Sequence, residues 1–282
     1  MTALSRSLDV GGIRDLAERF DYFILDQFGV LHDGTAPYPG AVDAVERLKA
    51  EGVTTLVLSN SGKRVGPNEA RLTALGFAPG IWTHFLTSGE VAWGMLNEML
   101  ADPSDLRCLL ISRDGDRSAV DGLPLRLTHD AATADIVLIS GSESELHDLA
   151  HYRKLLEPAA RRNVPAICTN PDKIMLTASG PCFGAGRIAD LYRELGGSVR
   201  MIGKPFAEIY DAAHRLLGMP DRSRIVCVGD SVEHDIAGGK AAGFSTALVE
   251  TGILETMTQT EKSGLFAQHD ATPDYLLARF AW

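Results

Sequence analysis

The sequence has no long apolar run: no stretch approaches the ~20 apolar residues that a helix needs to cross a bilayer. The N-terminal segment MTALSRSLDVGG lacks the charged and long apolar regions of a signal peptide. Positive charge is also scarce, since 27 Lys and Arg stand against 37 Asp and Glu for a net charge of -10. This balance argues against nucleic acid or an anionic membrane as partner. We therefore expect a cytoplasmic protein that binds neither.

Cysteine is rare, and its spacing indicates neither a metal site nor a disulfide. The four cysteines, Cys108, Cys168, Cys182 and Cys227, form no pair with metal-ligand spacing. Three of them lie in strand-like runs, so we expect small, buried, apolar residues there. The histidines show no ligand spacing either. The sequence also contains no internal repeat and no low-complexity segment.

Strand-like runs alternate with helix-like stretches, a pattern that favours an α/β fold with a mostly parallel sheet. Buried strands are expected at Thr54–Leu58 and at Ile225–Val228, the last well-marked strand of the core. A second αβ set, from 90 to 199, is long enough to bury a core of its own. We predict a doubly wound, Rossmann-like core of residues 1–89 and 200–282, interrupted by an inserted α/β domain of residues 90–199.

Four short segments, far apart in the sequence, carry the side chains that could perform chemistry. They are LDQFGVLHDG (25–34), LVLSNSG (56–62), IGKP (202–205) and VCVGDSVEHD (226–235). Three of them begin as apolar runs and break into polar residues, as a buried parallel strand does at its carboxyl end. Together they supply carboxylates for a metal ion, and a hydroxyl and an ammonium for a phosphate. This combination favours phosphoryl transfer.

The first two segments offer a nucleophile and a phosphate cradle. Asp26 directly follows a predicted strand, and its carboxylate could attack phosphorus and form an aspartyl-phosphate. Taken alone, an Asp at a strand end is most often a turn residue. Ser59 and Asn60 end the next strand, where a hydroxyl and backbone N–H groups could hold phosphate oxygens.

The last two segments offer a cation and two further carboxylates. Lys204 precedes a predicted helix, beside the positive end of its dipole, where an ammonium is useful only close to anionic charge. Asp230 and Asp235 can face one cation if the chain between them turns tightly. Hard oxygen ligands without a nearby His or Cys pair suit Mg²⁺.

These segments, in this order, resemble the haloacid dehalogenase (HAD) superfamily of phosphohydrolases. The resemblance is closest to the branch with a large α/β cap between the second and third motifs, which includes para-nitrophenyl, pyridoxal and phosphoglycolate phosphatases. PGA at 39–41, TSGE at 87–90 and TNPD at 169–172 add to it. The similarity extends over nearly the whole chain, and residues 90–199 correspond to the cap.

The resemblance implies a metal site in the core. Asp26 would be both the nucleophile and a Mg²⁺ ligand, and the backbone carbonyl of Phe28 would be a second ligand. Asp230 would ligate the same ion, and Asp235 would support the site. Mg²⁺ is the implied cofactor, and a small phosphorylated metabolite is the implied substrate.

The resemblance also implies where the substrate binds. Ser59, Asn60 and Lys204 would bind the transferred phosphoryl group, and Lys204 would in addition steady the nucleophile. Asn170 and Asp172 would belong to the cap side of the substrate cleft. Relatives with such a cap often dimerise through it, so a homodimer is one assembly that the resemblance allows.

One position departs from the family pattern. Family phosphatases carry a second Asp two residues after the nucleophile, and this chain has Phe28 there. That Asp protonates the leaving oxygen and then activates the attacking water. Losing such a group typically costs ~10²–10⁴-fold in rate.

Four interpretations of Phe28 remain open. The substrate could have a leaving group that needs little protonation, such as an acyl phosphate, an anhydride or a phenolic ester. Another acid could replace the missing Asp, with His32 and Asp33 the nearest candidates in sequence. The protein could bind a phosphorylated ligand without turnover. It could also be a dehalogenase-type hydrolase, although the Asp230/Asp235 pair and the place of the cap argue against that.

Overall fold

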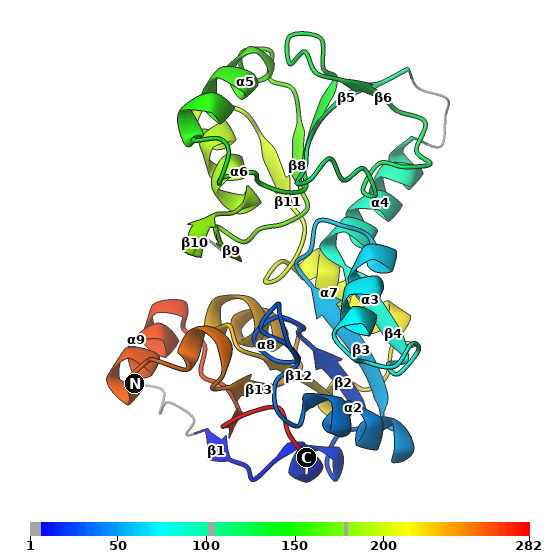
Figure 1. Ribbon diagram of the computed structural model, residues 1–282, viewed down its shortest axis with the longest axis vertical. Coiled ribbons are helices and arrows are strands. Elements are labelled where there is room, and N and C mark those ends of the chain that lie inside the picture. Colours follow the sequence, from blue (N-terminus) through cyan, green and yellow to red (C-terminus); the bar gives the residue numbers. More distant parts are fainter. Residues whose placement is uncertain (1–6, 101–104, 178–179) are drawn as a thin grey trace. The chain divides into compact units, whose positions relative to one another are not determined.

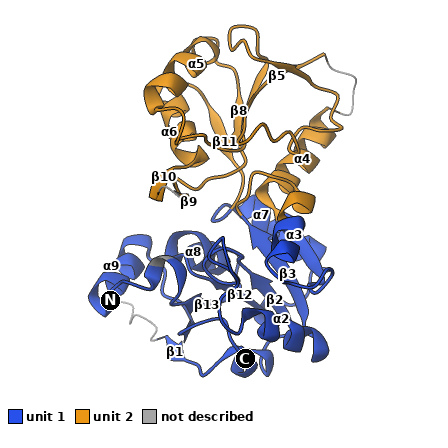
Figure 2. Cartoon of the chain, in the orientation of Figure 1, with its two compact units in different colours: residues 1–59, 69–86, 204–282 blue, residues 60–68, 87–203 orange. Residues whose placement is uncertain are grey.

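The computed structural model describes residues 7–100, 105–177 and 180–282, and the chain divides into two compact units (Figure 2). Unit 1 contains residues 1–59, 69–86 and 204–282, and unit 2 contains residues 60–68 and 87–203. Residues 1–6, the start of the segment that lacks signal-peptide features, lie outside the described residues. Among the helices of the described part, none is long and apolar enough to cross a membrane.

Unit 1 is built on a seven-stranded sheet with the strand order β1-β14-β13-β12-β2-β3-β4 (Figure 1). The pairings from β1 through β14, β13, β12 and β2 to β3 are all parallel. Because both faces of a parallel sheet are covered, its central strands are almost wholly apolar. The strands are β1 (Leu8–Asp9), β2 (Tyr22–Leu25), β3 (Thr54–Ser59), β4 (His84–Thr87), β12 (Ile225–Gly229), β13 (Ser245–Val249) and β14 (Tyr275–Leu277).

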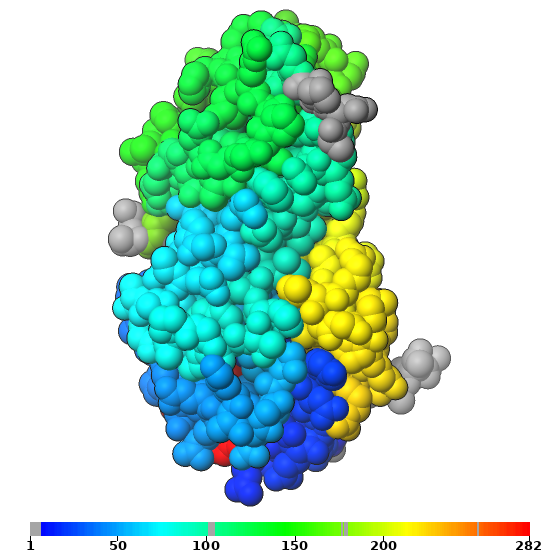
Figure 3. Space-filling view, turned by 90° about the vertical axis from the view of Figure 1, so that its right-hand side faces the viewer, coloured from blue at the N-terminus to red at the C-terminus, as the bar shows by residue number. Residues whose placement is uncertain are grey.

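Helices flank this sheet, and α2 (Ala41–Ala50) shows how the sequence specifies them. Ala41, Val45 and Leu48 recur at helical spacing and are buried on one face. Gly52, with φ of 74°, then lets the chain leave the helix. The remaining helical elements of the unit are α1 (Ile13–Ala17), α7 (Ala207–Leu216), α8 (Ala237–Ala241), α9 (Gln259–His269), the 3₁₀ turns η1 (Arg222–Arg224) and η3 (Gly252–Leu254), and the π-helical turn η2 (Val232–Ile236). Helix α3 (Val65–Ala74) begins in unit 2 and continues into unit 1 from residue 69. The outward side of α7 is seen in yellow in Figure 3.

The direction in which the chain adds strands reverses between β2 and β12. From β2 the sheet grows through β3 to β4, whereas from β12 it grows through β13 to β14 on the other side. The carboxyl ends of β2 and β12 therefore lie next to each other at a topological switch point. Ligands of open α/β sheets bind at such points.

Unit 2 has a five-stranded parallel sheet of its own, in the order β11-β8-β7-β5-β6. Its strands are β5 (Arg107–Ile111), β6 (Arg126–Thr128), β7 (Ile136–Ile139), β8 (Ala166–Cys168) and β11 (Val199–Met201), and its helices are α4 (Ser88–Met99), α5 (Leu149–Arg161) and α6 (Ala185–Glu194). The antiparallel hairpin of β9 (Ile174–Thr177) and β10 (Gly180–Phe183) is separate from this sheet.

Strand β7 explains how this second sheet is stabilised. Successive side chains of a strand point to opposite faces. Val137 and Ile139 accordingly pack in one apolar cluster with residues of α5 and α6, whereas Ile136 and Leu138 pack in another with residues of α4. Unit 2 therefore covers both faces of its sheet and has its own hydrophobic core.

Unit 2 differs from the predicted insertion of residues 90–199 by a few residues at each end and by one additional segment. Residues 60–68, 87–89 and 200–203 also belong to unit 2. The reason is local bonding: the Gly89 N–H donates to the Ser61 carbonyl at 3.0 Å, and the Arg64 guanidinium pairs with the Glu90 carboxylate at 2.7 Å. The segment after β3 is thereby tied to the start of α4.

Three strands of the core were not expected from the sequence. β13 and β14 follow Ile225–Val228, the last core strand that the sequence marks clearly, and β1 precedes β2. β1 and β14 have only two and three residues, too few to show an alternation of apolar and polar side chains. In unit 2, α5 begins at Leu149, because the Asp148 side chain accepts from the His151 N–H and caps the helix.

The expectation for the cysteines is confirmed within the described residues. All four are free, and Cys108, Cys168 and Cys227 are buried. Burial raises the pKa of the Cys108 and Cys168 thiols to about 12, so both remain protonated at neutral pH. They act as small apolar residues of the cores.

We expect Leu56→Ala to lower the free energy of unfolding by about 2–5 kcal/mol, because it deletes buried methyl groups from the centre of β3. The matched control is Leu216→Ala in α7, where the side chain is 40% exposed. The measurement is urea-induced unfolding of each variant. An equal loss for both variants would contradict the assignment of β3 to the core.

Candidate functional site

Three predicted site residues lie at the carboxyl edge of the unit 1 sheet. Asp26 follows β2, Ser59 ends β3 and Asp230 follows β12. These three strands are neighbours in the sheet, with Leu25 paired to Val57 on one side and to Val228 on the other. The Asp26 N–H continues the ladder by donating to the Val228 carbonyl at 2.9 Å. The site therefore lies at the switch point.

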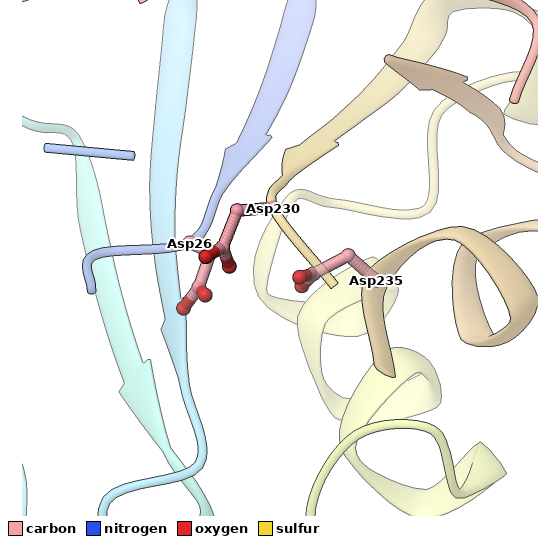
Figure 4. Close-up of side chains that lie close together, drawn as sticks. All are labelled: Asp26, Asp230 and Asp235. Carbon is pink, nitrogen blue, oxygen red and sulfur yellow. The ribbon is translucent and has the colours of Figure 1, made fainter. Parts of the chain in front are cut away.

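Three carboxylates converge there (Figure 4). One oxygen each from Asp26, Asp230 and Asp235 lies within 4.8 Å of the others, and no other group of three potential metal ligands lies so close among the described residues. Asp230 and Asp235 are buried, and the Asp26 side chain is only 13% exposed. A cluster of hard oxygen donors fits a divalent cation such as Mg²⁺ or Ca²⁺. In the same cluster, without a cation, like charges would repel one another.

Two glycines make room for the Asp230 carboxylate. A Cβ on Gly29 would lie 2.0 Å from Oδ2 of Asp230, and a Cβ on Gly252 would lie 2.1 Å from the same atom. Both glycines have positive φ, 82° and 63°. The Thr251 hydroxyl donates to the Gly29 carbonyl at 2.6 Å and joins the two loops. Close packing of backbone thus surrounds this carboxylate.

A π-helical turn places Asp235. In η2 the N–H groups of Asp235 and Ile236 both donate to the Ser231 carbonyl, at 2.9 and 3.2 Å. The Ser231 N–H in turn donates to Oδ2 of Asp235 at 3.2 Å. The buried Tyr210 hydroxyl donates to the His234 carbonyl at 2.7 Å and secures the wide turn. Such π turns occur often at functional sites because they redirect one side chain.

The Lys204 ammonium bridges two of the carboxylates. Its Nζ lies 2.8 Å from Oδ1 of Asp26 and 2.7 Å from Oδ1 of Asp235, and the side chain is 3% exposed. Burial by itself would lower the pKa of Lys204, but the charges of Asp235 and Asp26 outweigh burial and raise it. Lys204 therefore stays charged at every physiological pH.

The Asp26 carboxyl is less strongly acidic than an exposed Asp. Burial raises its pKa to about 6, while the Lys204 ammonium acts in the opposite direction. Oδ1 of Asp26 also accepts from the Gln27 N–H at 2.8 Å. At pH 7 the group is still mainly a carboxylate, the form in which it can act as a nucleophile.

Ser59 has a partner that the sequence analysis missed. The Gln27 side chain, 4% exposed, donates from Nε2 to the Ser59 hydroxyl at 2.5 Å. Gln27 stands directly after Asp26, so its position in the chain was the available signal. An amide in such a place has no pattern that distinguishes it from an ordinary turn residue.

Three predicted site residues belong to unit 2. The Asn60 amide donates to Oδ1 of Asp172 at 2.8 Å, and the Asp172 N–H donates to Oδ1 of Asn170 at 3.1 Å. The structure thus brings Asn60 together with the two residues predicted for substrate recognition. Its predicted part in phosphate binding stays a prediction.

Phe28 lies in the loop after β2, and the residue is 37% exposed. The ring packs edge-on against the His32 imidazole, with centroids 5.1 Å apart, and against Gly34, which has φ of 100°. His32 is fully buried, and its Nδ1 accepts from the Gly34 N–H at 2.9 Å. The aromatic side chain is therefore held in place by its own loop.

Two family models match parts of this chain. A family model described as haloacid dehalogenase-like hydrolase matches residues 23–126, and one described as HAD-hydrolase-like matches residues 201–281. Chronophin from Bos taurus is 27% identical over 283 residues, which cover 95% of this chain and 94% of chronophin.

Two solved structures are similar to this chain over most of its length. A haloacid dehalogenase-like hydrolase from Brucella suis 1330 superposes with a TM-score of 0.83 at 27% identity, over 96% of this chain and 99% of that one. A glycerol phosphate phosphatase from Mycobacterium tuberculosis, solved in complex with calcium, has a TM-score of 0.68 at 25% identity, over 84% of this chain and 68% of that one.

We expect Gly29→Ala to weaken binding of Mg²⁺ at least about tenfold, because the added methyl group must displace the Asp230 carboxylate. The matched control is Gly52→Ala, since Gly52 also has positive φ but a Cβ there would meet nothing within 4 Å. Both variants should lose some stability through backbone strain. Titration calorimetry with Mg²⁺ separates the two effects, and equal metal affinity in both variants would argue against a metal site at Asp230.

Proposed function

We propose that this chain, which belongs to the haloacid dehalogenase-like hydrolases in the branch with an inserted α/β cap, is a Mg²⁺-dependent phosphatase of a small phosphorylated metabolite. The observation that carries the proposal is the buried Lys204 ammonium within 2.8 Å of Asp26 and 2.7 Å of Asp235, beside the Asp230 carboxylate. A simple ion pair joins one ammonium to one carboxylate. Here one ammonium contacts two carboxylates, and the Asp230 carboxylate lies close to both. We interpret this cluster as a nucleophile next to a cation site.

In the proposed reaction a carboxylate oxygen of Asp26 attacks phosphorus, and the bond from phosphorus to the leaving oxygen breaks. Water then attacks the aspartyl-phosphate, releases inorganic phosphate and restores the carboxylate. The Lys204 ammonium orients Asp26 and offsets negative charge on the phosphoryl oxygens. The Ser59 hydroxyl, at the end of the neighbouring strand, holds another of these oxygens.

Asp26, Asp230 and Asp235 would hold the metal, with Asp235 in the supporting role because it also pairs with Lys204. A bound divalent cation supplies charge neutralisation on the phosphoryl oxygens. The Phe28 carbonyl stays a predicted ligand. Three carboxylates and one ammonium leave a net negative charge in the site, which favours a divalent cation and disfavours a metal-free hydrolase.

The protonation of the groups near Phe28 indicates which kind of leaving group the site would suit. Neither of the two nearest candidates for a replacement acid is in its protonated, acidic form at neutral pH. Burial lowers the pKa of His32 to about 4, so the imidazole is neutral at pH 7. The N–H groups of Ala36 and Thr35 hold the pKa of Asp33 at about 2, so that carboxyl carries no proton to give. We therefore favour substrates whose leaving group departs without protonation, such as acyl phosphates or phenolic esters.

We expect Asp26→Asn to reduce phosphate release at least about a thousandfold, because the amide cannot form the aspartyl-phosphate. Asp230→Asn should abolish the metal-dependent part of the activity. The control is Asp43→Asn in α2, where an exposed carboxylate pairs with Arg47. The assay is phosphate release from para-nitrophenyl phosphate, acetyl phosphate and glycerol phosphate with Mg²⁺. Unchanged turnover in a folded Asp26→Asn variant would refute the proposal.

We expect Phe28→Asp to raise hydrolysis of alkyl phosphates by up to about a hundredfold, since it adds a group that can protonate the leaving oxygen. Phe28→Leu, which removes the ring without adding an acid, should bring no gain. The measurement is kcat/KM for an alkyl and an aryl phosphate in both variants. No gain from Phe28→Asp, with Mg²⁺ still bound, would instead favour a protein that binds a phosphorylated ligand without turnover.

A further inference from the structure

Gln27 occupies an unusual position for a side-chain amide. It stands between the predicted nucleophile and the half-exposed Phe28, yet its own side chain is turned into the protein and only 4% exposed. Burying an amide costs free energy unless its polar atoms are hydrogen-bonded. A role in the structure or in the site is therefore expected for this residue.

The contacts of Gln27 join the ends of two neighbouring strands. Its backbone N–H donates to Oδ1 of Asp26 at 2.8 Å, and its Nε2 donates to the Ser59 hydroxyl at 2.5 Å. β2, which leads to Asp26, and β3, which ends at Ser59, are paired in parallel. One residue thus contacts both the nucleophile and the hydroxyl proposed to bind phosphate.

The direction of the second hydrogen bond decides what Ser59 can offer. A hydroxyl has one hydrogen to donate and two lone pairs that accept. Because Ser59 Oγ accepts from the Gln27 amide, the hydroxyl hydrogen is not used in this contact. Phosphoryl oxygens only accept hydrogen bonds, so a hydroxyl can bind them only as a donor.

We propose that Gln27 is a positioning residue that orients the Ser59 hydroxyl as a donor to the transferred phosphoryl group, an inference that rests on the proposed function. Gln27 acts through Ser59 and does not itself touch the substrate. The amide suits this role because it donates without carrying charge. A carboxylate of the same length would accept from Ser59, reverse the hydroxyl and add negative charge close to the phosphate.

The test is a double-mutant cycle of Gln27→Met and Ser59→Ala. Its readouts are the affinity for inorganic phosphate, measured by calorimetry with Mg²⁺ present, and KM and kcat for para-nitrophenyl phosphate. We expect Gln27→Met to weaken phosphate binding roughly 3- to 10-fold, and Ser59→Ala roughly 10- to 100-fold. In the Ser59→Ala background, Gln27→Met should change the affinity by less than about twofold, because its target is gone. The loss should appear in KM more than in kcat.

Gln27→Glu provides the second arm. It should weaken phosphate binding more than Gln27→Met does, although Glu is closer to Gln in shape, because its carboxylate accepts from Ser59 and repels phosphate. Gln268→Met in α9, where the Gln is exposed, is the matched control and should leave both readouts unchanged. A Gln27→Glu variant that binds phosphate as well as the wild type would overturn the proposal.

Other outcomes separate this inference from the proposed function. An equal effect of Gln27→Met in both backgrounds, or none in either, would show that Gln27 does not act through Ser59, whereas turnover lost in Asp26→Asn would still support the phosphatase. Coupling in phosphate affinity without measurable turnover would support the role of Gln27 and refute catalysis. Absence of phosphate binding in the wild type would overturn both.

Discussion

The site depends on one interaction, the buried ammonium of Lys204 between the carboxylates of Asp26 and Asp235. Three carboxylates within 4.8 Å of one another would repel strongly in a site of low dielectric constant. Lys204 cancels part of that charge, and the remainder is what a divalent cation would neutralise. The same cation–carboxylate contacts keep Asp26 largely ionised despite its burial. Loss of the ammonium would leave buried carboxylates without compensation, which is costly for stability as well as chemistry.

The topology of unit 1 brings these groups together from distant parts of the chain. Asp26 and Asp230 are delivered by strands that meet at the switch point, and Lys204 is the first residue of unit 1 after the whole of unit 2. Because unit 2 has its own sheet and cores, it can form without distorting the strands that present the site.

The convergence of residues at strand ends was predictable, whereas the geometry of the turns was not. The apolar runs before Asp26, Ser59 and Asp230 identify buried parallel strands, so their convergence could be expected from the sequence. The π turn that aims Asp235 at Lys204 depends on hydrogen bonds to a backbone carbonyl and has no residue pattern. The contact from Gln27 to Ser59 depends on a side-chain rotamer. Short edge strands such as β1 gave no periodic signal, and a cytoplasmic location and a homodimer stay predictions.

The backbone packed around Asp230 sets a minimum length for a fragment of the chain that retains the shape of the site. All the proposed reactive side chains occur at or before Asp235. Gly252, however, lies against the Asp230 carboxylate, and the Thr251 hydroxyl donates to the Gly29 carbonyl in the loop after Asp26. Both lie after β13, which is itself paired to β14. A fragment that retained every proposed reactive group but ended at α8 would lack one side of the proposed metal site. The last part of the chain contributes no chemistry of its own, but the shape of the site is incomplete without it.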